Sequence, residues 1–156
     1  MAELTLDLDY VGVDVVPAMI EQNRGKYQGP GKNFLVRDIT RDRLPDCDCV
    51  LCRDCLDHLS FEDALRALNN FRRSRAKYLL VTTYTDCTRN DDIVSGGGWR
   101  PTNLQLPPYS FPVPLWIINE QCTEEGGKWA DKSLALWRIQ ELPLPGNRLA
   151  SSFWVR

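Results

Sequence analysis

Four short apolar runs, separated by segments with helical signals, restrict the fold of this chain more than any other feature. The runs cover residues 10–15, 34–37, 49–52 and 78–83 and favour β-branched or aromatic residues. Each run is nearly continuous and does not alternate, as expected for strands that are buried on both faces of a parallel sheet. We therefore predict that these runs are the strands of a mostly parallel sheet.

Two segments between the runs predict helices. Pro17 suits the first position of a helix, and Gly29 is a plausible stop for it. Ser60 can cap a second helix, with Asp63 at the position of a capping-box acid, and apolar residues within 61–71 follow at helical spacing. The resulting order of strands and helices predicts an α/β fold.

The last third of the chain has a different pattern. Residues 86–115 are rich in glycine and proline and predict a long loop, a kind of segment that is usually functional or mobile. Two further apolar runs, 115–118 and 134–139, predict strands, and Gly126 and Gly127 lie in their connection. We expect these two strands to form an antiparallel hairpin.

Length and charge exclude several classes of protein. The 156 residues fit one domain, predicted over residues 1–142, followed by a tail over 143–156. Nineteen basic against twenty-one acidic residues give a net charge of −2, which argues against a dedicated nucleic-acid binder. No apolar run approaches the roughly 18 residues of a membrane span, and the amino terminus does not resemble a secretory signal. The six cysteines are therefore expected to be reduced thiols of a cytoplasmic protein.

Four of the cysteines lie close together in the sequence. Cys47, Cys49, Cys52 and Cys55 are followed by His58, the only histidine. A zinc site usually joins two short pairs that are separated by a dozen or more residues. Cys49 and Cys52 would also point to opposite faces of a strand. The sequence predicts no metal site here, but small buried or half-buried thiols.

Acidic residues end two of the predicted strands. Asp14 ends the strand predicted in the first run, and Asp38 follows the second run. In an open α/β sheet, ligands bind at the carboxyl ends of the strands. A carboxylate at Asp14 can accept both hydroxyls of a ribose, and Asp38 has the equivalent placement for an adenine amino group. The segment 52–59 follows the third run and leads directly into the second helix.

This ordered set resembles the class I, Rossmann-like S-adenosylmethionine-dependent methyltransferases, over roughly residues 10 to 142. Asp14 matches the ribose-binding acid of the family, and Asp38 matches its adenine-side acid. The resemblance implies S-adenosylmethionine as cofactor, S-adenosylhomocysteine as product, and cofactor contacts at these residues: Asp14, Val15, Asp38, Ile39 and Arg53.

The same resemblance implies where the methyl group is transferred. Asp54 matches the segment that flanks methionine and substrate, and His58 with Leu59 resembles the His-Leu pair that commonly follows it. Asp54 and His58 are therefore the predicted catalytic residues. Structural interpretations stay open beside this one: a turn acid at Asp14, a strand-end salt bridge of Asp54, and a backbone hydrogen bond of His58.

The sequence departs from the family pattern before Tyr10. The first strand of the family and its glycine-rich loop should lie upstream, and no Gly-x-Gly pattern is found there. We expect a methyltransferase-like domain that is incomplete at its amino terminus. The absent strand would lie between those carrying Asp14 and Cys52, leaving a gap of roughly 9–10 Å. The flanking strands could close up, residues 4–9 could fill the slot, or a second chain could supply a strand.

The sequence thus predicts a truncated methyltransferase domain that acts on an unknown acceptor or is inactive in this form. The alternative is a non-catalytic remnant of such a domain that serves in oligomerisation or partner binding. In that case a homo-oligomer would form through the exposed strand edges.

Overall fold

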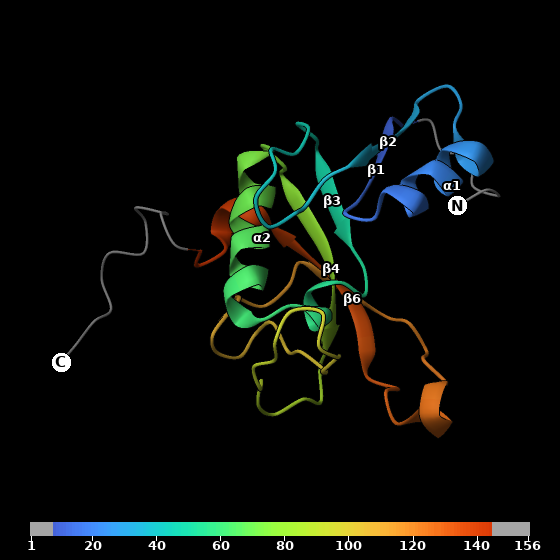
Figure 1. Ribbon diagram of the computed structural model, residues 1–156. Helices are drawn as coiled ribbons and strands as arrows, with labels where there is room; N and C mark the ends of the chain where they lie inside the picture. Colours follow the sequence, from blue (N-terminus) through green and yellow to red (C-terminus); the bar gives the residue numbers. More distant parts are fainter. Residues whose placement is uncertain (1–7, 145–156) are drawn as a thin grey trace.

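The computed structural model describes residues 8–144, in which the strands form two separate sheets (Figure 1). The elements of this part are, in chain order, β1 (Tyr10–Asp14), α1 (Pro17–Tyr27), β2 (Lys32–Val36), β3 (Cys49–Cys52), the 3-10 turn η1 (Leu56–His58), α2 (Phe61–Arg73), β4 (Tyr78–Tyr84), β5 (Trp116–Asn119), η2 (Glu124–Gly127), β6 (Lys132–Arg138) and η3 (Ile139–Glu141). All six strands and both helices that were predicted are present, with bounds that differ by one or two residues at most ends. The predicted tail lies almost entirely outside the described residues.

The pairing of the strands confirms the predicted fold class. β1 and β2 are parallel, with Tyr10 opposite Lys32 and Asp14 opposite Val36. The other sheet has the order β3-β4-β6-β5, in which β3 and β4 are parallel. β6 runs antiparallel to both β4 and β5, so the predicted hairpin is present. The chain is an α/β, Rossmann-like fold with an antiparallel carboxyl-terminal hairpin.

A gap separates the two sheets. Within residues 8–144, β1 pairs only with β2, and β3 pairs only with β4. The strands that flank the expected gap have therefore not closed up. Residues 4–7 of the segment proposed to fill the slot lie outside the described residues, while Leu8 and Asp9 belong to no strand.

The main core lies between α2 and one face of the four-stranded sheet (Figure 1). α2 begins at a cap in which the Ser60 hydroxyl accepts a hydrogen bond from the Asp63 amide at 3.1 Å. The predicted capping box is only half formed, because the Ser60 amide donates to the Ser95 hydroxyl and not to Asp63. The core side chains come from α2, β4 and β6: Ala64, Ala67, Leu68, Phe71, Leu79, Val81, Ala135 and Trp137.

The long loop over 86–115 takes part in this core. Leu104, Tyr109 and Phe111 are buried, and Phe111 packs against Trp137 with ring centroids 5.3 Å apart. The Trp137 indole donates to the Pro112 carbonyl at 2.8 Å. Tyr109 and Phe111 of the loop are thus packing residues.

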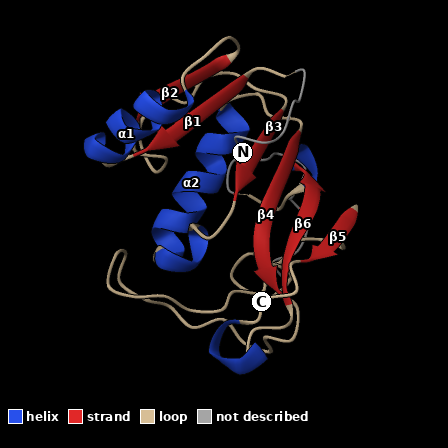
Figure 2. Ribbon diagram, turned by 90° about the vertical axis from the view of Figure 1, so that its right-hand side faces the viewer, coloured by secondary structure: helices blue, strands red, loops and turns tan. Residues whose placement is uncertain are grey.

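The prediction that the strands are buried on both faces is wrong for this sheet. Leu51, Leu80, Leu136 and Trp116 lie opposite one another across the four strands, yet Leu51 is 54% and Trp116 69% exposed. The reason is that α2 covers one face, whereas α1 packs on β1 and β2. In Figure 2 no helix lies in front of β4, β6 and β5. No helix within the described ranges is long and apolar enough to cross a membrane.

Candidate functional site

The end of β1 presents a carboxylate at the start of α1. The Asp14 Oδ1 atom accepts a hydrogen bond from the Val16 amide at 2.8 Å, which orders the turn before Pro17. Asp14 forms no ion pair with any described residue, and Val15 beside it is 57% exposed. The turn-acid interpretation of Asp14 is therefore correct for one oxygen, while the other oxygen remains available to a ligand.

The carboxylate after β2 is held by its own turn. Asp38 Oδ1 accepts from the Thr40 hydroxyl at 2.6 Å and from the Thr40 amide at 2.9 Å. Its Oδ2 atom pairs with Arg41 at 2.9 Å. The hydrogen bond from the Thr40 hydroxyl, helped by the Thr40 amide and the charge of Arg41, lowers the pKa of Asp38 although burial opposes it. Asp38 is thus a fixed anion that shapes the turn containing Ile39.

Asn70 of α2 fixes this turn from the other side, and sequence reasoning missed it. Its Nδ2 atom donates to the Ile39 carbonyl at 2.9 Å and to the Asp42 carbonyl at 2.6 Å. Asn70 is 7% exposed, and Ile39 packs on the main core. The two-stranded sheet is therefore attached to α2 although it is not paired with β3.

Asp54 lies just after β3 in a network of four charged side chains. Its residue adopts a left-handed backbone conformation with φ of 49°, and its amide donates to the Thr82 hydroxyl at 2.9 Å. Asp54 pairs with Arg53 at 2.9 Å and with Lys132 at 2.7 Å. Glu120 completes the network at 2.6 Å from Arg53 and 3.9 Å from Lys132.

Lys132 is the buried member of the network, with only 9% of its side chain exposed. Burial by itself lowers the pKa of Lys132, but the hydrogen bond to Asp54 and the charges of Asp54 and Glu120 outweigh it and raise that pKa. The strand-end salt bridge expected for Asp54 is therefore present. Lys132 and Glu120 belong to the hairpin, and no motif in the sequence links them to β3.

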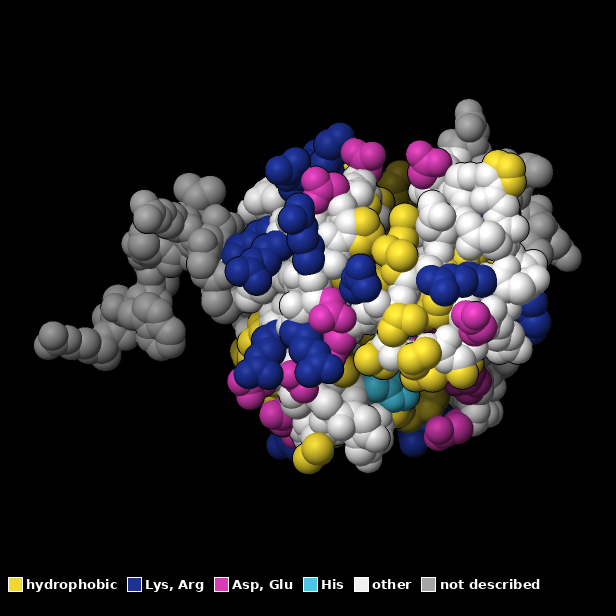
Figure 3. Space-filling view, turned by 45° about the horizontal axis from the view of Figure 1, so that its top comes forward, with side chains coloured by type: hydrophobic (Ala, Val, Ile, Leu, Met, Phe, Trp, Pro, Cys, Tyr) yellow, Lys and Arg dark blue, Asp and Glu magenta, His cyan; other side chains and the backbone are white. Residues whose placement is uncertain are grey.

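His58 is bound to the backbone of the glycine-rich part of the loop. Its Nδ1 atom lies 3.0 Å from the Gly98 carbonyl, and its carbonyl accepts from the Gly96 amide at 3.1 Å. Because a carbonyl only accepts, Nδ1 is the donor in this contact, and in the neutral imidazole Nε2 is then the accepting nitrogen. The imidazole is exposed, and Figure 3 shows the histidine side chain at the surface with apolar side chains around it.

Asp57, between the two predicted catalytic residues, is the buried acid of this segment. It is 3% exposed, and its Oδ2 atom accepts from the Trp99 indole at 2.6 Å. Its Oδ1 atom has no hydrogen-bond partner among the described residues. Burial raises the pKa of Asp57, and the hydrogen bond from Trp99 opposes this. No sequence signal distinguished Asp57 from its neighbours.

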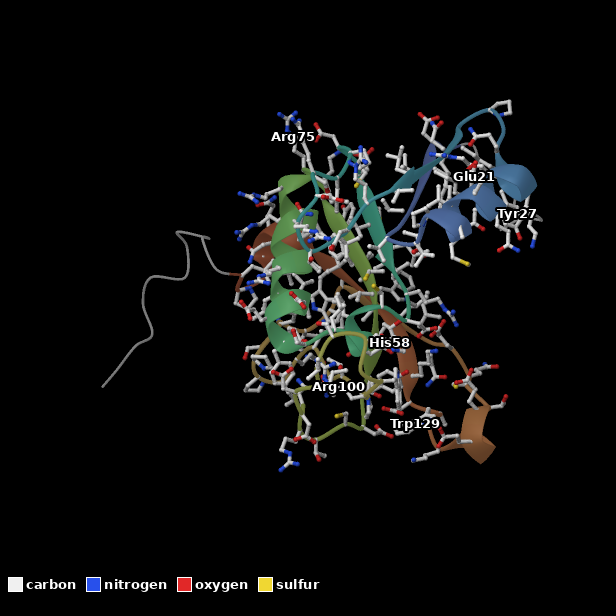
Figure 4. The ribbon with its side chains drawn as sticks, in the orientation of Figure 1. Glu21, Tyr27, His58, Arg75, Arg100 and Trp129 are labelled. Carbon is white, nitrogen blue, oxygen red and sulfur yellow. The ribbon has the colours of Figure 1, made fainter. Side chains whose placement is uncertain are left out.

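Arg100 fastens the loop over this segment. Its Nη1 atom donates to the carbonyls of Leu59 at 2.7 Å and Asp57 at 3.2 Å. The guanidinium also lies 5.0 Å from the centre of the Phe61 ring. Figure 4 shows His58, Arg100 and Trp129 at one end of the molecule, away from Glu21 and Tyr27 of α1.

The thiols around β3 are free. Cys52 is buried, and the hydrogen bond with the Cys55 thiol, together with burial, raises the pKa of Cys52. All six cysteines of the chain are unpaired. Within residues 8–144, no group of three or more His, Cys, Asp and Glu side chains is arranged to hold a metal ion.

Comparison with known proteins shows which families and folds this chain is similar to. Residues 1–77 match a family model described as a methyltransferase domain. No curated protein matches the chain in sequence. The structure is similar to human N-acetylserotonin methyltransferase in complex with SAM, with a TM-score of 0.57 and 15% identity over 82% of this chain and 39% of that chain. The chain thus spans about two fifths of that enzyme.

Two further solved structures show the same fold. The N-methyltransferase NodS from Bradyrhizobium japonicum WM9 matches with a TM-score of 0.54 and 17% identity, over 82% of this chain and 71% of that chain. The [4+2]-cyclase SpnF matches with a TM-score of 0.50 and 18% identity, over 65% and 40%. The resemblance to the class I methyltransferases is confirmed by the family match and the fold, whereas the roles of single residues stay predictions.

Proposed function

We propose that this relative of the class I methyltransferases binds S-adenosylmethionine and transfers its methyl group to an acceptor. One observation carries the proposal: Asp14, Asp38 and the segment 53–58 follow β1, β2 and β3 at the carboxyl ends of parallel strands. Ligands bind at this edge in open α/β sheets. The family match over residues 1–77 covers all of these positions.

The residues present fit such a cofactor. Asp14 has a carboxylate oxygen that its turn does not use, which suits a ribose hydroxyl beside Val15. Asp38 and Ile39 would face the adenine from a turn that Asn70 holds in place. Arg53 would lie near the methionine end, although Asp54 and Glu120 already share its guanidinium.

When bound, S-adenosylmethionine supplies an electrophilic methyl group: a lone pair of the acceptor forms the new bond, and the electrons of the carbon–sulfur bond stay on sulfur. The protein would mainly orient the two reactants in a dry site. His58 would accept the acceptor's proton at Nε2, because Gly98 holds its Nδ1–H. Asp54 would act through the charge network that positions Arg53 and Lys132.

The test is calorimetric titration of the full chain with S-adenosylhomocysteine. We expect micromolar binding that weakens about tenfold or more when Asp14 is replaced by alanine, because charge-assisted hydrogen bonds are lost. Asp48→Ala is the matched control, since Asp48 is exposed and precedes β3 at its opposite end. A well-folded chain that shows no binding would refute the cofactor role.

The gap between the sheets favours a second candidate function, the binding of a strand from another polypeptide. The edges of β1 and β3 have no strand partner between them in residues 8–144, and unpaired strand edges template such pairing. A second copy of the chain would then give the predicted homo-oligomer. Sedimentation equilibrium would detect it, and a monomeric mass at micromolar concentration would refute this form of the proposal.

The thiols and the net charge bear on the cellular location and on the class of acceptor. We propose a cytoplasmic protein, supported by the free state of all six thiols and by the reduced thiols that a cytoplasm maintains. The near-balanced charge supports an acceptor other than nucleic acid.

A further inference from the structure

A cavity lies next to the candidate site, between the loop that follows β4 and the segment that precedes β6. Its volume is about 580 Å³, within the range of small-molecule sites. It is lined by residues 86–89, Asp91, Pro101, Lys128, Trp129 and Asp131. Residues 86–89, Asp91 and Pro101 belong to the long loop that the sequence predicts, whereas Lys128, Trp129 and Asp131 were not singled out in the sequence.

Trp129, which lines the cavity, belongs to a cluster of three aromatic rings. The Trp129 ring contacts Trp99 at 4.7 Å and Tyr84 at 6.0 Å between centroids, and Tyr84 contacts Trp99 at 5.6 Å. All three contacts are edge-to-face, a geometry that fixes the rings against one another. Tyr84 ends β4, so the sheet positions the Trp129 ring from behind.

The Trp129 ring already holds a cation. The Lys128 ammonium lies 4.5 Å from its centroid, and the face of an indole attracts positive charge. Lys128 also pairs with Glu125 at 3.3 Å, and its side chain is 60% exposed. An exposed lysine of this kind can leave the ring when another cation binds.

Among the described residues that line the cavity, the charged side chains that form no ion pair are acidic. Arg89 pairs with Asp91 at 2.9 Å, whereas Asp86 and Asp131 form no ion pair with any residue of 8–144. Asp131 instead accepts the Asp86 amide at 2.9 Å. Behind the rings, Asp57 is buried and has one oxygen without a partner. A positive ligand would meet two free carboxylates and an aromatic face.

We propose that this cavity is the acceptor subsite of the proposed methyltransferase, and that it recognises the acceptor by an organic ammonium group on Trp129 beside Asp86 and Asp131. The assignment of the ligand as the acceptor rests on the proposed function. A carboxylate or phosphate ligand is disfavoured, because three of the five charged residues that line the cavity, Asp86, Asp91 and Asp131, are acidic.

The test compares benzylamine with benzyl alcohol, a neutral molecule with the same ring, by calorimetric titration of the full chain at constant ionic strength. Benzylamine is expected to bind about tenfold more tightly than the alcohol, since it adds charge and cation–π attraction. Asp131→Asn keeps an acceptor for the Asp86 amide and should weaken benzylamine severalfold while leaving benzyl alcohol unchanged. Trp129→Leu should weaken both ligands, and benzylamine more.

Glu21→Gln is the matched control, because it removes the same charge from an exposed position on α1, far from Trp129 (Figure 4). Equal affinities for the amine and the alcohol would overturn the proposal, as would equal behaviour of Asp131→Asn and Glu21→Gln. S-adenosylhomocysteine is titrated into the same samples. Selective amine binding without S-adenosylhomocysteine binding would support the cation site and refute the methyltransferase role.

Discussion

Replacing Asn70 by alanine should weaken the attachment of the two-stranded sheet to α2. Asn70 donates both amide hydrogens to the carbonyls of Ile39 and Asp42, at 2.9 Å and 2.6 Å, and is 7% exposed. Each hydrogen bond contributes about 1 kcal/mol, and a buried carbonyl without a partner adds to the loss. We expect the free energy of unfolding to fall by about 2–3 kcal/mol.

Asn69→Ala is the matched control on the same helix. The Asn69 amide donates to the Leu65 carbonyl within α2 at 3.1 Å, so its loss does not touch the turn over 39–42. Urea unfolding followed by circular dichroism measures the free energies of the two variants. Native-state hydrogen exchange should show faster exchange of β1 and β2 amides in Asn70→Ala alone. Equal stability and equal exchange in the two variants would refute the role given to Asn70.

Three further predictions concern the charge network, the core and the buried acid. Lys132→Met leaves Asp54 without its buried partner and should cost about 2–3 kcal/mol in urea unfolding at neutral pH, less than a fully buried pair because Asp54 is partly exposed. The pKa of Lys132 is raised in the folded state. The stabilisation by Lys132 is therefore complete below the pKa that this lysine has in the unfolded chain, and it is lost as the pH rises through its pKa in the folded protein. A Lys132→Met variant as stable as the parent at pH 7 would contradict this role. Leu68→Ala should cost about 3 kcal/mol, because Leu68 is fully buried, whereas Leu115→Ala at a 44% exposed position should cost far less; similar losses would contradict the packing described. The pKa of Asp57 is raised from 3.8 in the folded protein, so ionisation of Asp57 destabilises the fold. The stability of Asp57→Asn relative to the parent should therefore increase as the pH rises from about 3.8 through the pKa of Asp57 in the folded protein. A stability difference that does not depend on pH would contradict the raised pKa of Asp57.

The strands and helices were predictable because they depend on local signals. Pro17 and Ser60 mark helix starts by backbone chemistry that the sequence shows directly. Which face of a strand is covered depends on elements elsewhere in the chain, so the exposure of Leu51 could not be inferred from its apolar run. The pairing of Asp54 with Lys132 likewise depends on the antiparallel register of β4 and β6.

The sequence predicted at which strand ends the residues of the candidate site lie, but it did not predict which side chains contact one another there. Asp14 and Asp38 could be placed at the sheet edge because each lies at or just beyond the end of a predicted strand. The contacts that the loop over 86–115 makes with the site could not be predicted, because glycine and proline indicate backbone turns and not which side chains are buried. The sequence did not show that Trp99 and Arg100 of this loop bind Asp57 and the backbone beside it.

The separation of the two sheets has a consequence for the site as a whole. The proposed ribose and adenine residues belong to the β1–β2 sheet, while the proposed transfer residues follow β3 in the other sheet. No strand pairing within residues 8–144 fixes their spacing, so the attachment through Asn70 and the packing of Val13 and Ile39 on the core must do so. A ligand that contacts both Asp14 and the β3 end would bridge the two parts. Cofactor binding should therefore slow hydrogen exchange in β1 and β2, and Asn70→Ala should weaken that binding without removing any cofactor contact.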